Sequence, residues 1–376
     1  MAPPDDPRSH DERRPPRRPL LERAVIAAVI AHFLGAIALW MLLRLVAERW
    51  WPATALLYLP RWPWALPAVP LALLAWFCWR RGVWLALAAA AIVLGPVCGL
   101  RLGLAGGAAG PDSQPIRVVT LNIQNGKPNL AACLGEIERF DADIVMCQEV
   151  DSAQPELVES VRSIGLRHSR HDSHLWIASR WPLEHLRTVE SQATYRDICA
   201  TYRTRLPDGT VLHLANVHLA TARHGLTKLR LRSPITGVGL DELHAHQTER
   251  LAEIDELQAT LDALPAPSLV GGDFNMPTDS PGFAPLLRTH RSVFDAVGRG
   301  YGYSVPNDAG GWPRGLCWLR VDHLLVSTGV TPLAAQVGDS VGSDHRAMLG
   351  RVAVAPRRQA EVVVGEKVAP RPPSRR

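Results

Sequence analysis

Two polar side chains follow an apolar run in the C-terminal half of the chain. The segment S-L-V-G-G-D-F-N-M-P-T, residues 268–278, places a carboxylate, Asp273, and a carboxamide, Asn275, directly after two glycines. The leucine and valine before them are typical of a buried strand, and the glycines allow backbone or a ligand to approach closely. Side chains two residues apart on a strand share a face, so we expect both groups to point the same way at the rim of a sheet. A turn after the strand would explain the same two residues.

Five further short motifs place polar residues at or near the ends of expected strands. Taken singly, Asn122 fits a turn, Glu149 a solvated strand end, His218 a buried strand histidine and Asp344 a helix cap. As an ordered series they are seldom produced by chance, and carboxylates, carboxamides and histidines are groups that bind hard cations and transfer protons. The motifs are L-N-I (121–123), Q-E-V (148–150), N-V-H-L (216–219), V-D-H (321–323) and S-D-H (343–345).

The elements that must position these motifs lie in residues 115–354, about 240 residues, which is enough for one sizeable domain. The hydrophobic pattern there predicts mostly short strands with a few helices. Helices are expected over 130–139, over 242–264, which leads into the strand before Asp273, and over 285–294. Strands are expected over 116–123, 143–150, 175–179, 198–205, 210–219, 319–327 and 347–354.

G-D-F-N together with a final S-D-H, in this order, resembles the endonuclease/exonuclease/phosphatase superfamily of DNase-like fold. That superfamily contains apurinic endonucleases, neutral sphingomyelinases and inositol polyphosphate 5-phosphatases. The resemblance covers essentially all of residues 115–354. It implies an α/β (α+β) fold, a four-layer α/β sandwich in which two mostly antiparallel sheets pack face to face with helices outside. The strand pattern is compatible with this architecture.

The resemblance implies a metal region made of three residues. Asn122 of L-N-I and Glu149 of Q-E-V match the family's metal-binding pair, and Asp344 of S-D-H would complete the region. Glu149 supplies a hard oxygen ligand suited to Mg²⁺. We therefore expect Mg²⁺ as the cofactor, with Mn²⁺ as a substitute.

The same resemblance implies catalytic roles. Asp273 would orient or deprotonate the attacking water, and Asn275 would bind substrate by donating to a phosphate oxygen. His345 would bind the scissile phosphate or act as the acid or base, with Asp322 of V-D-H holding its ring in one tautomer. Phosphodiester hydrolysis needs an aligned water, neutralised equatorial oxygens and a stabilised leaving oxygen, and these groups with one divalent cation supply them.

Three more residues are assigned less directly. His218 of N-V-H-L matches the second histidine of DNase-like members, Asp197 falls where its carboxylate partner is expected, and Asn216 is expected to support substrate binding in the same region. One position departs from the pattern: apurinic endonucleases carry an aspartate two residues after the first asparagine, and here that residue is Gln124. This difference argues against a role in DNA repair.

The first quarter of the chain is strongly apolar and predicts a membrane segment. Residues 24–43 contain one strongly polar side chain, His32, and are long enough to cross a hydrocarbon core of about 30 Å. Residues 83–100 form a second candidate span, and residues 63–79 a shorter third one interrupted by prolines. Eight of the 12 tryptophans lie between Trp40 and Trp84, as expected for interface anchors. We expect three spans, with two spans or a cleaved signal peptide as alternatives.

The arginine distribution predicts the orientation of these spans. Arginines crowd the segment before the first span, and Arg80 and Arg81 separate the second from the third, so both ends belong inside. Three spans then place the catalytic domain outside the cell membrane, whereas two spans keep it inside. Arginines in the first loop oppose this orientation; they are Arg44, Arg49 and Arg61.

The domain plan follows from these observations. We expect a basic disordered N-terminus (1–23), a multi-pass transmembrane region (24–102), a glycine-rich flexible linker (103–114), the catalytic domain (115–354) and a basic disordered tail (355–376). The six cysteines show no C-x-x-C pair or zinc spacing, so we expect them to be buried structural residues.

These features predict a membrane-anchored, Mg²⁺-dependent phosphohydrolase that cleaves a phosphodiester. Membrane lipid is the expected partner of the N-terminal helices, and the sequence indicates no protein partner. The membrane segment favours a phospholipid headgroup as substrate, and the net charge of +5 favours nucleic acid. A phosphomonoesterase and a catalytically inactive scaffold displayed at the membrane are the alternatives.

Overall fold

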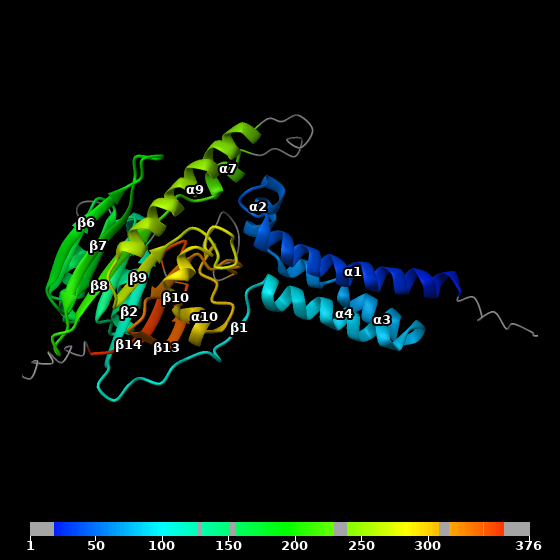
Figure 1. The fold of residues 1–376 in the computed structure, drawn as a ribbon, viewed down its shortest axis with the longest axis horizontal. Helices are drawn as coiled ribbons and strands as arrows, with labels where there is room; N and C mark the ends of the chain where they lie inside the picture. The colour runs from blue at the N-terminus through cyan, green and yellow to red at the C-terminus, as the bar shows by residue number, and fades with distance from the viewer. Residues whose placement is uncertain are drawn as a thin grey trace, which may run out of the picture.

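The computed structural model describes residues 19–126, 129–150, 155–228, 239–307, 316–340 and 342–356. They form two parts, a helical bundle from the N-terminal quarter and a β-sandwich flanked by helices (Figure 1). Residues 1–18 of the predicted N-terminal extension and residues 357–376 of the predicted tail lie outside the described residues. Residues 20–23, expected to be disordered, instead begin the helix α1.

Two six-stranded mixed sheets form the sandwich. One has the strand order β10-β12-β9-β8-β7-β6 and the other the order β13-β14-β2-β3-β5-β4. Each sheet contains one parallel pair, β8 with β9 and β2 with β3, and its other pairs are antiparallel. The strands of the first sheet are β6 (Leu183–Glu190), β7 (Asp197–Arg205), β8 (Val211–His218), β9 (Ser268–Asp273), β10 (Arg291–Ser292) and β12 (Asp322–Val326). Those of the second are β2 (Gln114–Asn122), β3 (Ile144–Gln148), β4 (His168–Asp172), β5 (Leu175–Ser179), β13 (Val330–Val337) and β14 (Met348–Val354).

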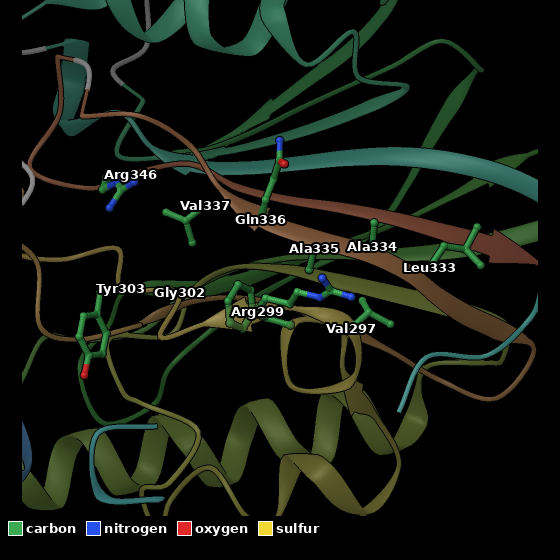
Figure 2. A pocket seen from close by; sticks show the side chains of 11 residues that line it. Val297, Arg299, Gly302, Tyr303, Leu333, Ala334, Ala335, Gln336, Val337 and Arg346 are labelled. Carbon is green, nitrogen blue, oxygen red and sulfur yellow. The ribbon is translucent and has the colours of Figure 1, made fainter. Parts of the chain in front are cut away.

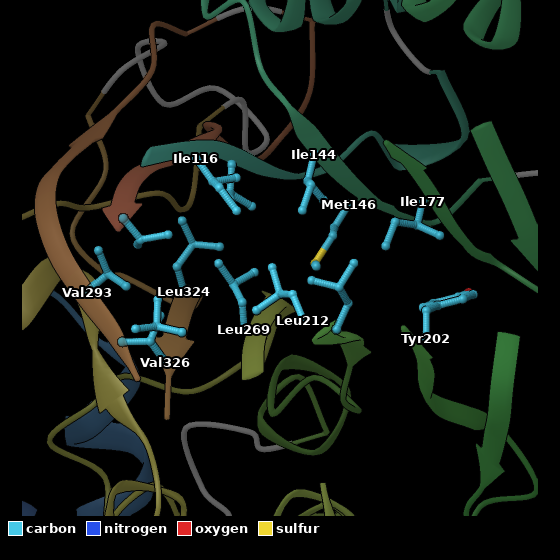
Figure 3. Packing of buried hydrophobic residues seen from close by; sticks show 14 of the residues in the cluster. Ile116, Ile144, Met146, Ile177, Tyr202, Leu212, Leu269, Val293, Leu324 and Val326 are labelled. Atoms are coloured by element: carbon cyan, nitrogen blue, oxygen red, sulfur yellow. The ribbon is translucent and has the colours of Figure 1, made fainter. Parts of the chain in front are cut away.

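The main core lies between the two sheets and follows the two-residue period of the strands. In β3, Ile144 and Met146 point into this core, and in β9 Leu269 meets them from the opposite sheet (Figure 3). The alternate residues, such as Val145 in β3 and Val270 in β9, pack against helices on the outer faces. Both faces of the central strands are therefore buried, which explains their nearly continuous apolar sequences.

Helices cover the outer faces of both sheets. α5 (Leu130–Arg139) and α6 (Pro155–Ser163) pack on the sheet that contains β2 and β3. The long helix α9 (Leu240–Ala263) packs on the sheet that contains β8 and β9 (Figure 1). The molecule thus has the expected four layers, and the predicted α/β sandwich is confirmed. The segment expected as a helix over 285–294 instead forms a short turn η4 (Leu286–Arg288), β10 and the start of α10 (Val293–Val297).

The N-terminal part is a bundle of antiparallel helices that extends away from the sandwich (Figure 1). α1 (Leu20–Leu45) runs toward the sandwich and is followed there by the short helix α2 (Trp51–Tyr58). The chain then runs back outward through a 3₁₀ turn η1 (Trp62–Ala65) and α3 (Ala68–Cys78), and it returns through α4 (Arg80–Ile92) and a π-helical turn η2 (Val93–Val97).

Two apolar clusters fix the direction of these helices. At the far end of the bundle, Val25 and Val29 of α1 pack with Ala75 of α3. At the end nearest the sandwich, Leu43 of α1 packs with residues of α2 and η2, which include Leu57 and Val97. The start of α4, with Arg80 and Arg81, therefore lies at the far end, beside the start of α1.

In the described residues, two of the three expected spans are long enough to cross a membrane and the third is shorter. Two helical stretches are long and apolar enough to cross a membrane, Leu20–Leu45 and Arg80–Val97. The middle stretch, Trp62–Cys78, is apolar but shorter. Pro63 lies in the 3₁₀ turn η1 and Pro67 directly before α3, which begins at residue 68, and neither proline donates a backbone hydrogen bond.

The segment expected to be a flexible linker packs along the sandwich. β1 (Arg101–Leu102) pairs with β11 (Arg299–Gly300), and the Ala105 N–H donates to the carbonyl of Ala296. Gly106 and Gly107 approach the sandwich so closely that an added Cβ would lie within 3 Å of side-chain carbons of Val297 and Thr331. The glycines of this segment therefore serve close packing.

Candidate functional site

The polar motif residues continue the inward-facing series of the strands beyond the apolar core. In β8 the inward residues after Leu214 are Asn216 and His218, and in β9 the inward residues after Leu269 are Gly271 and Asp273. His218 is the register partner of Asp273 in the parallel pair β8–β9. Asp273 is in turn opposite Asp322 of β12. The site therefore forms where the space between the two sheets opens at one end of the sandwich.

Two glycines permit this arrangement. A Cβ on Gly272 would lie 2.0 Å from the carbonyl oxygen of Val217 in the neighbouring strand. A Cβ on Gly271 would lie 2.8 Å from the sulfur of Met146 and 2.9 Å from a methyl group of Leu324, inside the core between the sheets. The glycine pair of the 268–278 segment is thus required by close approach of strands and sheets.

His345 lies between two buried carboxylates. Its Nδ1 is 2.9 Å from Oδ2 of Asp322, and its Nε2 is 3.7 Å from Oδ2 of Asp273. Asp322 and Asp273 are 0% and 1% exposed. The bond to Asp322 fixes the ring with Nδ1 protonated, which leaves Nε2 directed toward Asp273 and the opening of the site.

Asn122, Glu149 and His218 complete the cluster from the second sheet and from β8. The Nδ2 group of Asn122 donates to Glu149 Oε1 at 2.9 Å and to Asp273 Oδ2 at 3.2 Å. His218 Nε2 lies 3.7 Å from both Glu149 Oε1 and Asp273 Oδ2. The motifs predicted from L-N-I, Q-E-V, N-V-H-L, G-D-F-N and V-D-H therefore converge with His345 around the Asp273 carboxylate.

The two histidines have opposite charge preferences. Burial disfavours the His345 imidazolium, but the Asp322 and Asp273 carboxylates outweigh burial and raise the pKa of His345 above its ordinary value. Burial lowers the pKa of His218 well below its ordinary value, and the nearby His174, Arg196 and His345 lower it further. His345 is therefore a cationic donor at neutral pH, whereas His218 is neutral.

Burial also shifts the titration of the carboxylate at the centre. Desolvation raises the pKa of Asp273, the Asp322 charge adds to this effect, and His345 opposes it. A carboxylate whose pKa approaches neutrality is better matched to accepting a proton from water than an ordinary aspartate.

Asn275 holds Asp273 from the adjoining loop. Its backbone N–H donates to Asp273 Oδ1 at 2.8 Å, and its side-chain Nδ2 donates to Asp273 Oδ2 at 3.1 Å and to the Leu219 carbonyl at 2.8 Å. In this arrangement the Asn275 carboxamide is committed to Asp273 and Leu219, so it supports the carboxylate and is not aimed at a substrate oxygen.

The structure does not fit the expected substrate contact of Asn216. This residue is 0% exposed and lies between the sheets, where its Nδ2 donates to the carbonyls of Cys147 and Trp176. Its Oδ1 accepts from Nε2 of Gln148 at 2.7 Å. Asn216 is one pleat deeper than His218, so it joins the two sheets and does not reach the opening.

Asp197 is also not where the resemblance placed it. It begins β7 opposite Glu190, and within the described part of the chain it forms no hydrogen bond or ion pair with His218. Its charge acts instead on His174, whose ring lies edge-on to His218 with a centroid distance of 4.9 Å. His174 belongs to none of the sequence motifs. Its position next to His218 depends on the fold of the turn between β4 and β5.

Asp344 lies beside the cluster and faces a cation. Its Oδ2 is 3.8 Å from an Nη1 of Arg223, a residue that the sequence motifs did not indicate. The Asp344 charge also contributes to raising the pKa of His345. Asp344 therefore belongs to the electrostatic surroundings of His345.

The donor set fits a hard divalent cation. Four carboxylates lie at this open end of the sandwich, which we call the rim: those of Glu149, Asp273, Asp322 and Asp344. Oxygen donors of this kind suit Mg²⁺ and Mn²⁺. Asp322 Oδ1 is buried without a hydrogen-bond partner among the described residues. Asp273, Asp322 and His345 each offer one ligand atom, and these atoms lie within 4.8 Å of one another. Because the raised pKa of His345 favours a proton on that ring, a cation there must compete with the proton.

A cavity of about 570 Å³ lies apart from this cluster, along the edge strand β13 and the segment after α10 (Figure 2). Arg346, the residue after His345, stands at one end of the cavity, and Leu333 and Val297 stand at the other. None of the converging motif residues lines it. The chemistry of the motifs therefore belongs to the open end of the sandwich and not to this cavity.

Two comparisons found similar proteins, a family match and a set of solved structures. Residues 119–345 match the endonuclease/exonuclease/phosphatase family. An AP endonuclease from Archaeoglobus fulgidus is 14% identical, with 62% of this chain and 98% of that chain covered and a TM-score of 0.47. The 3′ phosphatase NExo from Neisseria, bound to a product DNA hairpin, is 14% identical over 62% and 98%, with a TM-score of 0.46. Truncated TDP2 from Caenorhabditis elegans is 18% identical over 64% and 98%, with a TM-score of 0.46.

No curated protein sequence matches this chain. The family match nevertheless spans more than half of its length and runs from β2 through His345, the segment that supplies every residue of the rim. On that match, the chain belongs to the endonuclease/exonuclease/phosphatase family.

Proposed function

We propose that this chain is a membrane-anchored, divalent-metal-dependent phosphohydrolase that cleaves a phosphodiester. The observation that carries the proposal is the placement of His345 between Asp322 at 2.9 Å and Asp273 at 3.7 Å, next to the Asn122–Glu149 pair. Such a set combines a cationic donor for a phosphate oxygen with a carboxylate able to take a proton from water.

Each residue has a role in this proposal. Asp273, held by Asn275, orients the attacking water and accepts its proton. His345, held by Asp322, donates to a non-bridging or leaving oxygen of the phosphate. Neutral His218 accepts a hydrogen bond on the opposite side of Asp273. When bound, Mg²⁺ or Mn²⁺ would neutralise developing negative charge on the phosphoryl oxygens.

Glu149 and Asn122 are the residues we propose for holding the cation, with Asp344 contributing charge from the rim. Glu149 is about a third exposed, so a hydrated ion can reach it from solvent. Mg²⁺ usually keeps several waters and binds few protein carboxylates, which suits an open position of this kind.

The helical bundle supports anchoring in a membrane. Only 22% and 28% of the most apolar windows in its two long helical stretches are buried, unlike core helices of a soluble domain. Large apolar side chains such as Leu73, Phe77 and Trp84 are 62%, 84% and 74% exposed. Trp62 and Trp64 are exposed near the sandwich, and Trp76 and Trp84 near the far end, as expected for two interface belts. The second stretch begins at residue 80, too far from the N-terminus for a signal sequence.

Two classes of phosphodiester fit the arrangement. The bundle ends beside the catalytic rim, which favours a phospholipid headgroup, whereas the net charge of +5 favours nucleic acid. A phosphomonoesterase differs from both in accepting a terminal phosphate.

The test uses the full-length protein in detergent micelles or nanodiscs. Hydrolysis of bis-p-nitrophenyl phosphate, p-nitrophenyl phosphate, plasmid DNA and sphingomyelin is measured with Mg²⁺, with Mn²⁺ and with EDTA. We expect diester hydrolysis that EDTA abolishes and that Asp273→Ala and His345→Ala reduce by roughly 10²-fold or more.

Matched controls are available on α9. Asp255→Ala and His244→Ala remove the same residue types from exposed positions and are expected to leave the rate unchanged. Glu149→Gln should raise the Mg²⁺ concentration needed for half-maximal rate. Absence of hydrolysis of every phosphoester with either metal would favour the scaffold alternative, and a preference for p-nitrophenyl phosphate would favour the monoesterase.

A further inference from the structure

The segment between α1 and η1 docks on the catalytic rim through buried polar contacts, which we call the anchor junction. Glu48 and Arg250 are 3% and 4% exposed, although both carry charge. The residues of the anchor junction are Glu48, Thr54 and Tyr58 from the N-terminal part and Gln247, Arg250, Asn275, Ser280 and Gly282 from the sandwich.

Glu48 is fully committed within this junction. Its Oε1 lies 3.3 Å from Nη1 of Arg250 and 3.0 Å from the hydroxyl of Tyr58. Its Oε2 accepts from the Ser280 hydroxyl and from the Gly282 N–H. Buried ion pairs contribute little net stability because desolvation offsets their attraction, so tight docking alone does not account for this one.

Tyr58 and Arg250 converge on the backbone carbonyl of Asn275, in the loop directly after β9. The Tyr58 hydroxyl lies 3.1 Å from the carbonyl oxygen of Asn275, and Arg250 Nη2 lies 3.2 Å from the same oxygen and 2.8 Å from the Tyr58 hydroxyl. The single hydroxyl proton of Tyr58 is thus placed between the acceptors of Glu48 and Asn275. Burial raises the pKa of Tyr58, which keeps that proton in place.

Asn275 connects the anchor junction to Asp273 through hydrogen bonds. Its backbone N–H and side-chain Nδ2 both donate to the Asp273 carboxylate, at 2.8 and 3.1 Å. Asn275 also has a φ of 50°, in the left-handed region that residues other than glycine adopt at a cost. A backbone in that region needs outside support to stay fixed, and the anchor junction supplies it at the carbonyl of the same residue.

We propose that Tyr58 and Arg250 are positioning residues that set the orientation of the Asp273 carboxylate through Asn275, so that the membrane segment completes the catalytic rim. The proposal rests on the proposed function for its kinetic consequence. Glu48 is the residue that holds both of them, through one carboxylate oxygen.

Tyr58→Phe tests the proposal with the smallest change, because it removes the hydroxyl and keeps the ring and the backbone carbonyl that accepts from Trp318 Nε1. Gln247→Met is the matched control. Gln247 is 7% exposed in the same junction and donates to Thr54 at 2.6 Å, and among the described residues it forms no hydrogen bond with Tyr58 or Asn275. Tyr58→Phe removes the hydroxyl contacts with Glu48, Asn275 and Arg250. Gln247→Met removes the hydrogen bond to Thr54 from the same junction. Both variants are made in the full-length protein in nanodiscs.

We expect Tyr58→Phe to lower kcat for bis-p-nitrophenyl phosphate by roughly tenfold, with KM nearly unchanged, since a small misplacement of a reacting group slows the chemical step. Gln247→Met should keep the wild-type kcat even if it lowers the melting temperature as much as Tyr58→Phe does. Equal kcat values for the two variants would overturn the proposal while leaving the proposed function intact. An inactive wild type would instead count against the proposed function.

Hydrogen exchange gives a readout that needs no activity. In Tyr58→Phe the amide of Asn275 and its neighbours in residues 273–276 should exchange about tenfold faster than in the wild type, because the loop loses its outside support. Gln247→Met should leave exchange in that segment unchanged. Identical exchange of residues 273–276 in wild type and Tyr58→Phe would refute the positioning role whatever the substrate is.

Discussion

At the scale of single residues, the charge on His345 decides whether the proposed site offers a cationic hydrogen-bond donor to a phosphate. Two carboxylates, with Asp322 the larger influence, raise the pKa of this histidine against the effect of burial. Its imidazolium therefore persists at neutral pH and is lost only as the pH rises through that raised value. A rate that depends on the imidazolium should show the same alkaline decline.

Asp322→Asn tests this dependence. Removing the carboxylate lowers the pKa of His345, so the alkaline decline of kcat/KM should move to lower pH, and kcat should fall by roughly 10²-fold. The measurement is kcat/KM against pH for wild type and variant with a substrate that does not titrate in the range. An alkaline decline at the same pH in both proteins would show that His345 is not the group that titrates.

A substitution of Asn216 tests whether this residue stabilises the fold or contacts the substrate. Asn216→Ala removes the buried hydrogen bonds from Gln148 and to the carbonyls of Cys147 and Trp176, which should cost roughly 1–3 kcal/mol of unfolding free energy. Denaturant unfolding measures that loss, and KM of the folded fraction should be unchanged. A raised KM with wild-type stability would restore the substrate-binding role expected from the sequence.

At the scale of elements, strands buried on both faces were the most predictable. The expected strands 116–123 and 143–150 appear as Gln114–Asn122 and Ile144–Gln148, because continuous aliphatic runs have few alternatives to a central strand. The edge strands β4 and β6 carry mostly polar residues and escaped prediction, since one of their faces is exposed. Local pattern also cannot show how deep an inward polar residue lies, which is why Asn216 was assigned to the opening and is found between the sheets.

The element-scale prediction concerns the β8–β9 contact. Gly272→Ala would bring a Cβ to 2.0 Å from the Val217 carbonyl and should cost more than about 3 kcal/mol, or prevent folding. Gly135→Ala is the control: Gly135 lies within α5, has open space around it, and should gain about 0.5–1 kcal/mol. Thermal unfolding of both variants compares them, and equal melting temperatures would mean that the strands can separate without loss.

At the scale of the whole molecule, the motifs located the rim, but nothing in the sequence located the anchor junction. Glu48 and Arg250 belong to no motif, and their contact depends on the complete fold. The linker expected to separate the two parts is instead packed on the sandwich, and the junction joins them directly. The predicted separation into an anchor and an independent domain therefore underestimates how far the two parts share one structure.

Topology is the prediction at this scale. Arg80 and Arg81 lie at the end of the bundle away from the sandwich. We propose that Leu20–Leu45, the shorter stretch Trp62–Cys78 and Arg80–Val97 all cross the membrane, in which case the positive-inside tendency places the sandwich outside. A reporter active only in the cytoplasm should be inactive when fused after residue 376 and active when fused before residue 1. Activity of the C-terminal fusion would place the catalytic part inside and limit the bundle to an even number of crossings.

The Glu48–Arg250 pair also has a consequence for synthesis. Its members are 202 residues apart, so at ordinary elongation rates Glu48 is added to the chain roughly 10–40 s before Arg250. Under the proposed membrane anchoring, the first helix would enter the membrane during that interval, before Glu48 has its cationic partner. Insertion of the helices would then precede closure of the junction, and a chain interrupted before α9 would leave Glu48 and Tyr58 without Arg250.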